Sequence, residues 1–315
     1  MTKREDNEFL RSAHPVEPAV RAQILEELRA IEARHDVAVL FACESGSRGW
    51  GFASPDSDYD VRFIYVHRLP WYLTVAPGRD VIELPISGPS AAPGRPKQAS
   101  APSGGSEDTS VPSVGAPPLD INGWELRKAL GLMRESNPTL LEWLRSPIVY
   151  REEAGTMARF RTLAEAVYTR TRAWHHYRSM AKKNFREHLQ GEAVRFKKYL
   201  YVLRPLLAAR WIAARDGVPP MRFAELAQQV LDARADAALI AEIDALLEVK
   251  MRAGEAATSP RWPGIHAFIE AELASPADAP PPAPFRDGAG ALDVFLRDTV
   301  LRFGAPAQEK EEGAA

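Results

Sequence analysis

The sequence ESGSRGWGFASPDSDYDVRFIYV, residues 44–66, decides the fold of this chain. A short, continuous apolar run at residues 36–42 leads into it and is typical of a buried strand. Residues 59–66 form a second run that is rich in β-branched and aromatic side chains. The pattern therefore predicts that Gly46 and Ser47 lie at the turn after one strand and that Asp58 and Asp60 open the next strand.

These four residues suggest a particular chemistry. Residues i and i+2 of a strand point to the same face, so Asp58 and Asp60 should present two carboxylates side by side. Two like charges this close require cations or protons between them, and hard oxygen ligands suit Mg²⁺ or Mn²⁺. The backbone N–H groups of Gly46 and Ser47, at a turn that opens a short helix, would bind a phosphate. Together they predict phosphoryl or nucleotidyl transfer with two metal ions.

Other motifs do not fit this stretch. An EF-hand loop starting at Asp56 would need glycine where Val61 stands and glutamate where His67 stands. The sequence contains neither a G-x-x-x-x-G-K-[ST] phosphate loop nor a G-x-S-x-G nucleophile elbow around Ser47. The remaining structural alternative is that residues 54–58 form a solvated turn before a strand.

The whole chain reads as an α/β half followed by an all-α half. Helical spacing of apolar residues covers 18–34, and short strands are expected at 36–42, 59–66, 79–86 and 119–121. A helix is expected from Gly123 onwards, an almost continuous one over 159–215, and further helices at 221–251, 261–274 and 288–303. The 315 residues suit two domains, which we place at 1–150 and 151–274, followed by a linker at 275–287 and a short helix with an acidic tail at 288–315.

Composition limits the function further. Residues 87–118 contain 24 Pro, Ser, Gly or Ala among 32 positions, so we expect a disordered insert there. A single cysteine, Cys43, excludes a disulfide framework and a multi-cysteine metal site. The formal net charge of −2 excludes a polybasic whole-chain nucleic-acid binder. The chain has no apolar run long enough to span a bilayer and no signal-peptide pattern at its charged start, so we expect a cytoplasmic protein.

The near-neutral charge conceals a basic segment. Residues 170–210 carry eleven Lys or Arg against two Glu, with aromatic residues interleaved. Such a segment would suit a triphosphate and a polynucleotide, whereas the ordinary alternative is a solvated helical face. Lys183, Lys197 and Lys198 are the candidate phosphate contacts. Arg48 and Arg62, which flank the motif, are further candidates because a guanidinium can bind two phosphate oxygens.

The stretch at 44–66 resembles the nucleotidyltransferase motif of the DNA polymerase β superfamily, namely Gly-Ser, a gap and Asp-x-Asp on a strand. More narrowly, the chain is similar to the bacterial RNA-repair-pathway DNA polymerase β family. The similarity continues in INGWELRKAL (121–130), SNPTLLEWLRSP (136–147) and FKKYLYVLRPLL (196–207). It covers roughly residues 35–86 and 119–225, and the insert at 87–118 departs from it.

The resemblance implies a small mixed sheet flanked by helices, followed by a helical substrate- and nucleotide-binding domain. It also implies that Asp58 and Asp60 bind two Mg²⁺ or Mn²⁺ ions and that a third carboxylate completes the site. Asp120 fits the third position, at the end of a short strand, and Glu83 on the preceding strand is its rival. Gly46 and Ser47 would hold the phosphates of a nucleoside triphosphate (NTP).

The implied activity is transfer of a nucleoside monophosphate (NMP) from an NTP to a hydroxyl, with an RNA 3′ end as the acceptor. Two alternatives stay open. The enzyme could instead modify a protein or a small molecule, or the fold could serve a non-catalytic nucleotide sensor or a toxin–antitoxin partner. The intact Gly-Ser and Asp-x-Asp argue against the non-catalytic reading, and the basic segment favours RNA. Oligomeric state and base preference are not readable from the sequence.

Overall fold

The computed structural model describes residues 15–76, 78–84, 118–191, 193–252, 258–274, 280 and 288–304. The expected insert lies outside the described residues except for Pro118, and so do most of the expected linker and the tail from residue 305. The expectations for those segments therefore stay predictions.

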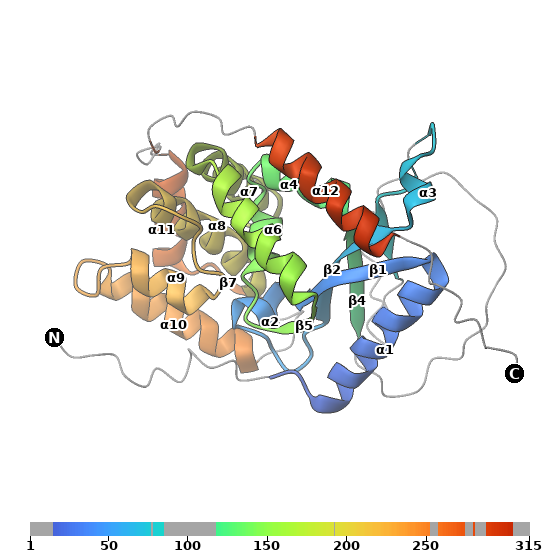
Figure 1. The fold of residues 1–315 in the computed structure, drawn as a ribbon. Coiled ribbons are helices and arrows are strands. Elements are labelled where there is room, and N and C mark those ends of the chain that lie inside the picture. The colour runs from blue at the N-terminus through green and yellow to red at the C-terminus, as the bar shows by residue number, and fades with distance from the viewer. Residues whose placement is uncertain are drawn as a thin grey trace, which may run out of the picture.

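A five-stranded mixed sheet forms the centre of the first half (Figure 1). Its strand order is β3-β4-β2-β1-β5. The strands are β1 (Val37–Glu44), β2 (Tyr59–His67), β3 (Val81–Glu83), β4 (Leu119–Glu125) and β5 (Val149–Glu152). Strands β2 and β4 run parallel, whereas the β1–β2, β1–β5 and β3–β4 pairs are antiparallel. The sheet thus brings together two strands that stand far apart in the sequence.

Helices cover both faces of the sheet. Helix α1 (Pro18–His35) buries its predicted apolar stripe in a core with Val61 and Phe63 of β2. The opposite face packs against α4 (Leu126–Arg134), α5 (Pro138–Leu144), α6 (Ala154–Val167) and α12 (Ala289–Phe303). Because strand residues alternate between faces, Ile64 and Val66 lie in this second core. The second face also carries Asp60 and Arg62, at the beginning of β2.

A helical region, α7–α11, follows the sheet half and lies to its left in Figure 1. It consists of α7 (Arg170–His188), α8 (Phe196–Ala214), α9 (Phe223–Val230), α10 (Ala237–Arg252) and α11 (Pro263–Ala274). A two-stranded sheet of β6 (Ala193–Arg195) and β7 (Thr258–Pro260) joins it. Helix α8 is buried along most of its length and forms the centre of this core. The mixed sheet with flanking helices and a following helical region confirms the predicted fold class.

Several boundaries differ from the prediction. The expected helix from Gly123 begins only at Leu126, because residues 123–125 continue β4. The expected long helix over 159–215 is instead three helices, α6, α7 and α8, with β6 between the last two. Strand β5 was not predicted. Residue 150, the expected end of the first domain, lies within this strand, and the division into domains stays a prediction. Helix α6, expected in the helical domain, packs on the sheet, as does α12.

None of the helices in the described part of the chain has both the length and the apolar character needed to cross a membrane.

Candidate active site

The Gly-Ser turn packs directly against the second aspartate of the motif. Gly46 follows β1 and begins the short helix α2 (Gly46–Trp50) with a left-handed φ of +55°. A Cβ added to Gly46 would lie 1.8 Å from Asp60 Oδ2, so any side chain here would collide with the carboxylate. The Ser45 N–H also donates to the Asp60 carbonyl at 2.8 Å. Glycine is therefore required both by the backbone conformation and by the closeness of Asp60.

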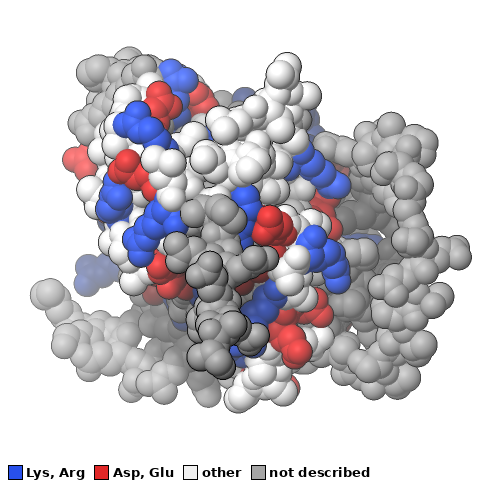
Figure 2. Space-filling model, turned by 45° about the vertical axis from the view of Figure 1, so that its right-hand side comes forward, with Lys and Arg blue, Asp and Glu red and all other residues white. Residues whose placement is uncertain are grey.

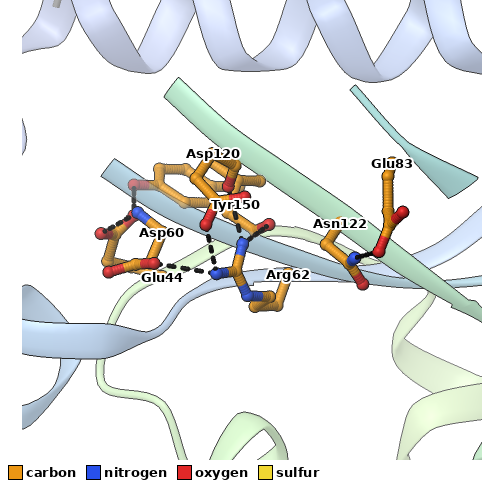
Figure 3. A network of polar contacts seen from close by, with 8 residues as sticks. Glu44, Asp60, Arg62, Glu83, Asp120, Asn122 and Tyr150 are labelled. Atoms are coloured by element: carbon orange, nitrogen blue, oxygen red, sulfur yellow. Dashed lines mark hydrogen bonds and ion pairs between the residues drawn. The ribbon is translucent and has the colours of Figure 1, made fainter. Parts of the chain in front are cut away.

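Asp60 and Asp120 stand side by side on the sheet. They are direct partners in the parallel register of β2 and β4, so their side chains emerge on the same face. The Arg62 guanidinium lies between them, with Nη2 2.8 Å from Asp60 Oδ1 and 2.9 Å from Asp120 Oδ2 (Figure 3). Burial acts to lower the pKa of Arg62, but the two carboxylates outweigh burial and raise this pKa. The cluster is therefore a charge-compensated group at the beginning of two parallel strands.

Asp58 and Glu83 lie differently. Asp58 is half-buried and stands one residue before β2, so its place beside Asp60 stays a prediction. Glu83 is exposed on β3 opposite Asn122, whose Nδ2 donates to Glu83 Oε1 at 3.0 Å. Figure 3 shows Glu83 apart from the Asp60–Asp120 pair. The structure thus brings Asp120, and not Glu83, next to Asp60.

A buried glutamate supports the aspartates from behind. Glu44, the last residue of β1, accepts the Asp60 N–H through Oε1 at 2.9 Å and the Tyr150 O–H through Oε2 at 2.6 Å. Burial raises the pKa of Glu44 to about 8, although the hydrogen bond from Tyr150 acts in the opposite direction. Neither Glu44 nor Tyr150 was predicted as a site residue. The signal for Glu44 in the sequence is a carboxylate that ends an otherwise apolar strand, two residues before Gly46.

Arg48 and Lys250 hold the turn between α2 and β2. Arg48 is only 4% exposed, its guanidinium carbon lies 4.0 Å from the Tyr59 ring centroid, and Nη2 donates to the Ser57 carbonyl at 3.0 Å. Lys250 of α10 is 2% exposed and donates to Ser54 Oγ at 2.8 Å. Arg48 thus braces the motif turn, and its predicted phosphate contact stays a prediction. Ser47 is also buried, in the first turn of α2.

A second buried polar cluster joins α2 to the helical region. Glu142 of α5 accepts hydrogen bonds from Trp50 Nε1 at 3.1 Å and from the Tyr177 hydroxyl at 3.1 Å, and it forms an ion pair with Arg204. Arg204 also donates to the Met221 carbonyl through Nη2 at 3.1 Å. Glu142 and Arg204 are 6% and 3% exposed. This pair fixes α2, and with it the Gly-Ser turn, against α7 and α8.

The basic segment is less basic in three dimensions than in sequence. Four of its arginines pair with carboxylates from other segments, in the pairs Arg170–Asp216, Arg172–Glu135, Arg204–Glu142 and Arg210–Glu272. Figure 2, which brings the right-hand side of Figure 1 forward, shows blue and red side chains interspersed on that face of the molecule. The excess of Lys and Arg over Glu counted along residues 170–210 therefore overstates the positive electrostatic potential around this segment.

The predicted lysines occupy different positions. Lys183 is exposed on α7, whereas Lys197 and Lys198 are half-buried in the first turn of α8. Lys198 Nζ lies 3.0 Å from His188 Nε2 and 5.2 Å from the centroid of the Tyr201 ring. That ring packs edge-on against Trp50 with centroids 5.5 Å apart. Ring contacts through Tyr201 therefore connect Lys198 with Trp50 of α2.

The carboxylate oxygens of Asp60 and Asp120 suit a hard divalent cation, although the described residues do not form a complete metal site. Among the described residues, no three His, Cys, Asp or Glu side chains come close enough to share a metal ion. Asp60 Oδ1 and Asp120 Oδ2 nevertheless both approach one cationic nitrogen, so a cation is already accommodated between them. Carboxylate oxygens are the preferred ligands of Mg²⁺ and Mn²⁺. The chemistry of the pair fits such an ion, and the place it would occupy holds a guanidinium.

The chain is similar to proteins already known. The chain is 42% identical over 254 residues to the uncharacterized protein YcgL of Bacillus subtilis (strain 168), which covers 81% of this chain and 85% of that protein. A nucleotidyltransferase-like protein from Exiguobacterium sibiricum 255-15, of known crystal structure, matches 91% of this chain and 83% of its own, at 10% identity and a TM-score of 0.28. A TM-score this low adds nothing to the assignment.

The decisive match is to a family. Residues 20–89 and 110–298 match the RNA repair pathway DNA polymerase beta family, which covers the sheet half, the helical region and most of α12. The matched residues include Gly46, Asp60 and Asp120. The chain belongs to the RNA repair pathway DNA polymerase beta family.

Proposed function

We propose that this protein is a metal-dependent nucleotidyltransferase that transfers an NMP from an NTP to a hydroxyl and releases pyrophosphate. The observation that carries the proposal is the contact of the Gly46 backbone with Asp60, which stands directly opposite Asp120. A phosphate-binding turn and two carboxylates thus meet at one place, as in-line transfer with charge neutralisation requires.

We assign different roles to the acidic residues of the site. Asp58, Asp60 and Asp120 would hold two Mg²⁺ or Mn²⁺ ions. When bound, these ions would neutralise phosphate charge and lower the pKa of the attacking hydroxyl. Asp120 would orient that hydroxyl, and Glu44 would keep the Asp60 backbone in place. The arrangement supports Asp120 over Glu83 as the third carboxylate.

The nucleotide phosphates would bind at the start of α2. The N–H groups of Gly46 and Ser47 would donate to phosphate oxygens, as at other glycine-containing turns that open a helix. Lys197 and Lys198, in the first turn of α8, would add positive charge from the helical region, and Lys183 would contact the outer part of the substrate. Arg48, held by Tyr59 and Ser57, would act only through the shape of the turn.

An RNA 3′ end is the acceptor that we propose. The family is tied by its name to an RNA repair pathway. Exposed cations that remain on the helical region, such as Lys182, Lys183 and Arg186, suit a polyanion better than a cationic small molecule. A protein or small-molecule acceptor and a non-catalytic nucleotide sensor are the competing outcomes of the test below.

The test offers α-³²P-labelled NTPs, one at a time, with Mg²⁺ and either bulk RNA, tRNA or protein. We expect labelled RNA, lost in Asp60→Asn and Asp120→Asn and retained in Glu83→Gln, which changes a carboxylate of the same sheet that lies apart from the pair. Labelled protein with unlabelled RNA would refute the RNA acceptor. No label on any acceptor, together with tight NTP binding, would favour the sensor.

A further inference from the structure

One guanidinium neutralises both carboxylates of the pair. Besides its two ion pairs, Arg62 donates through Nη1 to the Asp120 carbonyl at 2.7 Å and to its neighbour, the Val61 carbonyl, at 3.0 Å. The side chains of Arg62, Asp60 and Asp120 are 15%, 26% and 17% exposed. Arg62 therefore folds back along its own strand and fills the space between two strands with a fixed positive charge.

This arrangement has a clear electrostatic purpose. Two half-buried carboxylates directly opposite each other on paired strands would repel without a counter-ion. An arginine cannot give up its proton in a protein, so this positive charge can leave the pair only by moving. The bonds to two neutral carbonyls involve Nη1, whereas both carboxylates bind Nη2. The nitrogen between the carboxylates thus occupies the position that suits a divalent cation.

We propose that Arg62 is an internal placeholder for that cation and that its guanidinium withdraws from Asp60 and Asp120 when Mg²⁺ or Mn²⁺ binds there. The inference rests on the proposed function, because it takes the two carboxylates to be metal ligands. Oxygens that face one guanidinium nitrogen at hydrogen-bond distance cannot at the same time coordinate a metal in that space. Arg62 therefore competes with the metal, and the protein keeps its carboxylate pair in place without one.

Competition predicts the direction of a mutational effect on metal affinity. Arg62→Met removes the competing charge while it keeps an unbranched side chain of similar width. Hydrogen bonds to charged groups contribute enough for their loss to change an affinity by roughly tenfold or more. We therefore expect Arg62→Met to bind Mn²⁺ about tenfold more tightly than the wild-type protein does when no nucleotide is present.

The experiment measures Mn²⁺ binding by titration calorimetry and by the loss of the free-ion EPR signal. Arg151→Met is the matched control, because Arg151 pairs with Glu32 at 2.6 Å on the same half of the protein but away from the site. Arg62→Lys keeps a charge without the fork, so an affinity between those of wild type and Arg62→Met is expected. It also provides a second variant if Arg62→Met does not fold. Thermal unfolding of Arg62→Met should begin at a lower temperature without metal and be restored by Mn²⁺.

The outcomes separate the two claims. Equal or weaker Mn²⁺ binding in both Arg62 variants, with binding abolished in Asp60→Asn, would overturn the placeholder role alone. Unchanged Mn²⁺ binding in Asp60→Asn and Asp120→Asn, or no binding by any variant, would overturn the metal site of the proposed function, and the placeholder with it. Tighter binding in Arg62→Met that Asp60→Asn abolishes supports both.

Discussion

Removal of Arg204 should destabilise the protein far more than removal of an exposed arginine. Arg204→Met leaves the Glu142 carboxylate buried without its cation, and breaking a buried pair in this way typically costs about 3–5 kcal/mol. Glu142 would keep two neutral donors, Trp50 Nε1 and the Tyr177 hydroxyl, so we expect the lower end, about 3 kcal/mol. The measurement is urea-induced unfolding monitored by tryptophan fluorescence. The urea concentrations at half-unfolding of the wild type and the variant are compared with one common dependence of the unfolding free energy on urea concentration.

Two further variants test the cause of this loss. Glu142→Gln keeps an oxygen for the neutral donors but removes the charge, so the double variant Glu142→Gln/Arg204→Met should recover about 2 kcal/mol of the loss. Arg252→Met, which breaks an exposed pair with Glu248, should cost less than about 1 kcal/mol. A loss in Arg204→Met no larger than in Arg252→Met, or no recovery in the double variant, would refute the reasoning.

Three more predictions follow from single positions. Gly46→Ala should lower the free energy of unfolding by about 1–3 kcal/mol, because alanine is strained at a left-handed φ and its Cβ would displace Asp60. The same substitution should abolish NMP transfer. Unchanged transfer would contradict the close contact of Gly46 with Asp60. The native protein keeps the Glu44 proton up to about pH 8 while the unfolded chain releases it near pH 4.5, so stability should fall as pH rises between these values. The loss of unfolding free energy has an upper limit of about 5 kcal/mol, and Glu44→Gln should remove this pH dependence. Urea unfolding of the wild type and of Glu44→Gln at pH 5, 6.5 and 8 measures it. Parallel pH profiles of the two proteins would count against the role of Glu44. Cys43, buried and with its pKa raised by burial, should react with Ellman's reagent only after unfolding, and rapid labelling of the native protein would disagree.

Much of the fold could be predicted from local sequence. The apolar stripe of α1 and the apolar runs that form β1 and β2 are local signals, and burial on the sheet confirms them. The end of β4 could not be predicted in this way. A Cβ on Gly123 would lie 2.2 Å from the Phe63 ring, and Trp124 pairs with Val81, so tertiary pairing holds residues 123–125 in the strand against their helical pattern.

Some features of the candidate site could likewise be predicted from local sequence, and others depend on tertiary contacts. The spacing of Gly46 and Asp60 predicted that the Gly-Ser turn and a motif aspartate would share one site, and they are in contact. The pairing of Asp60 with Asp120 depends on a strand register between residues far apart in the chain, so the sequence left Glu83 open as well. Burial of Arg48 depends on the Tyr59 ring and could not be predicted from its place beside Ser47. The residue roles and the division at residue 150 stay predictions.

The ammonium of Lys250 links the motif turn to a helix near the other end of the chain. It reaches the Ser54 hydroxyl from 196 positions further along the sequence, and Ser54 is itself fully buried and hydrogen-bonded to Ser57. A fragment that ended before α10 would contain every residue of the Gly-Ser and Asp-x-Asp motif. It would nevertheless lack the buried ammonium that donates to the Ser54 hydroxyl in this turn. The shape of the motif turn in the sheet half therefore depends on a side chain from α10, in the helical region that follows it.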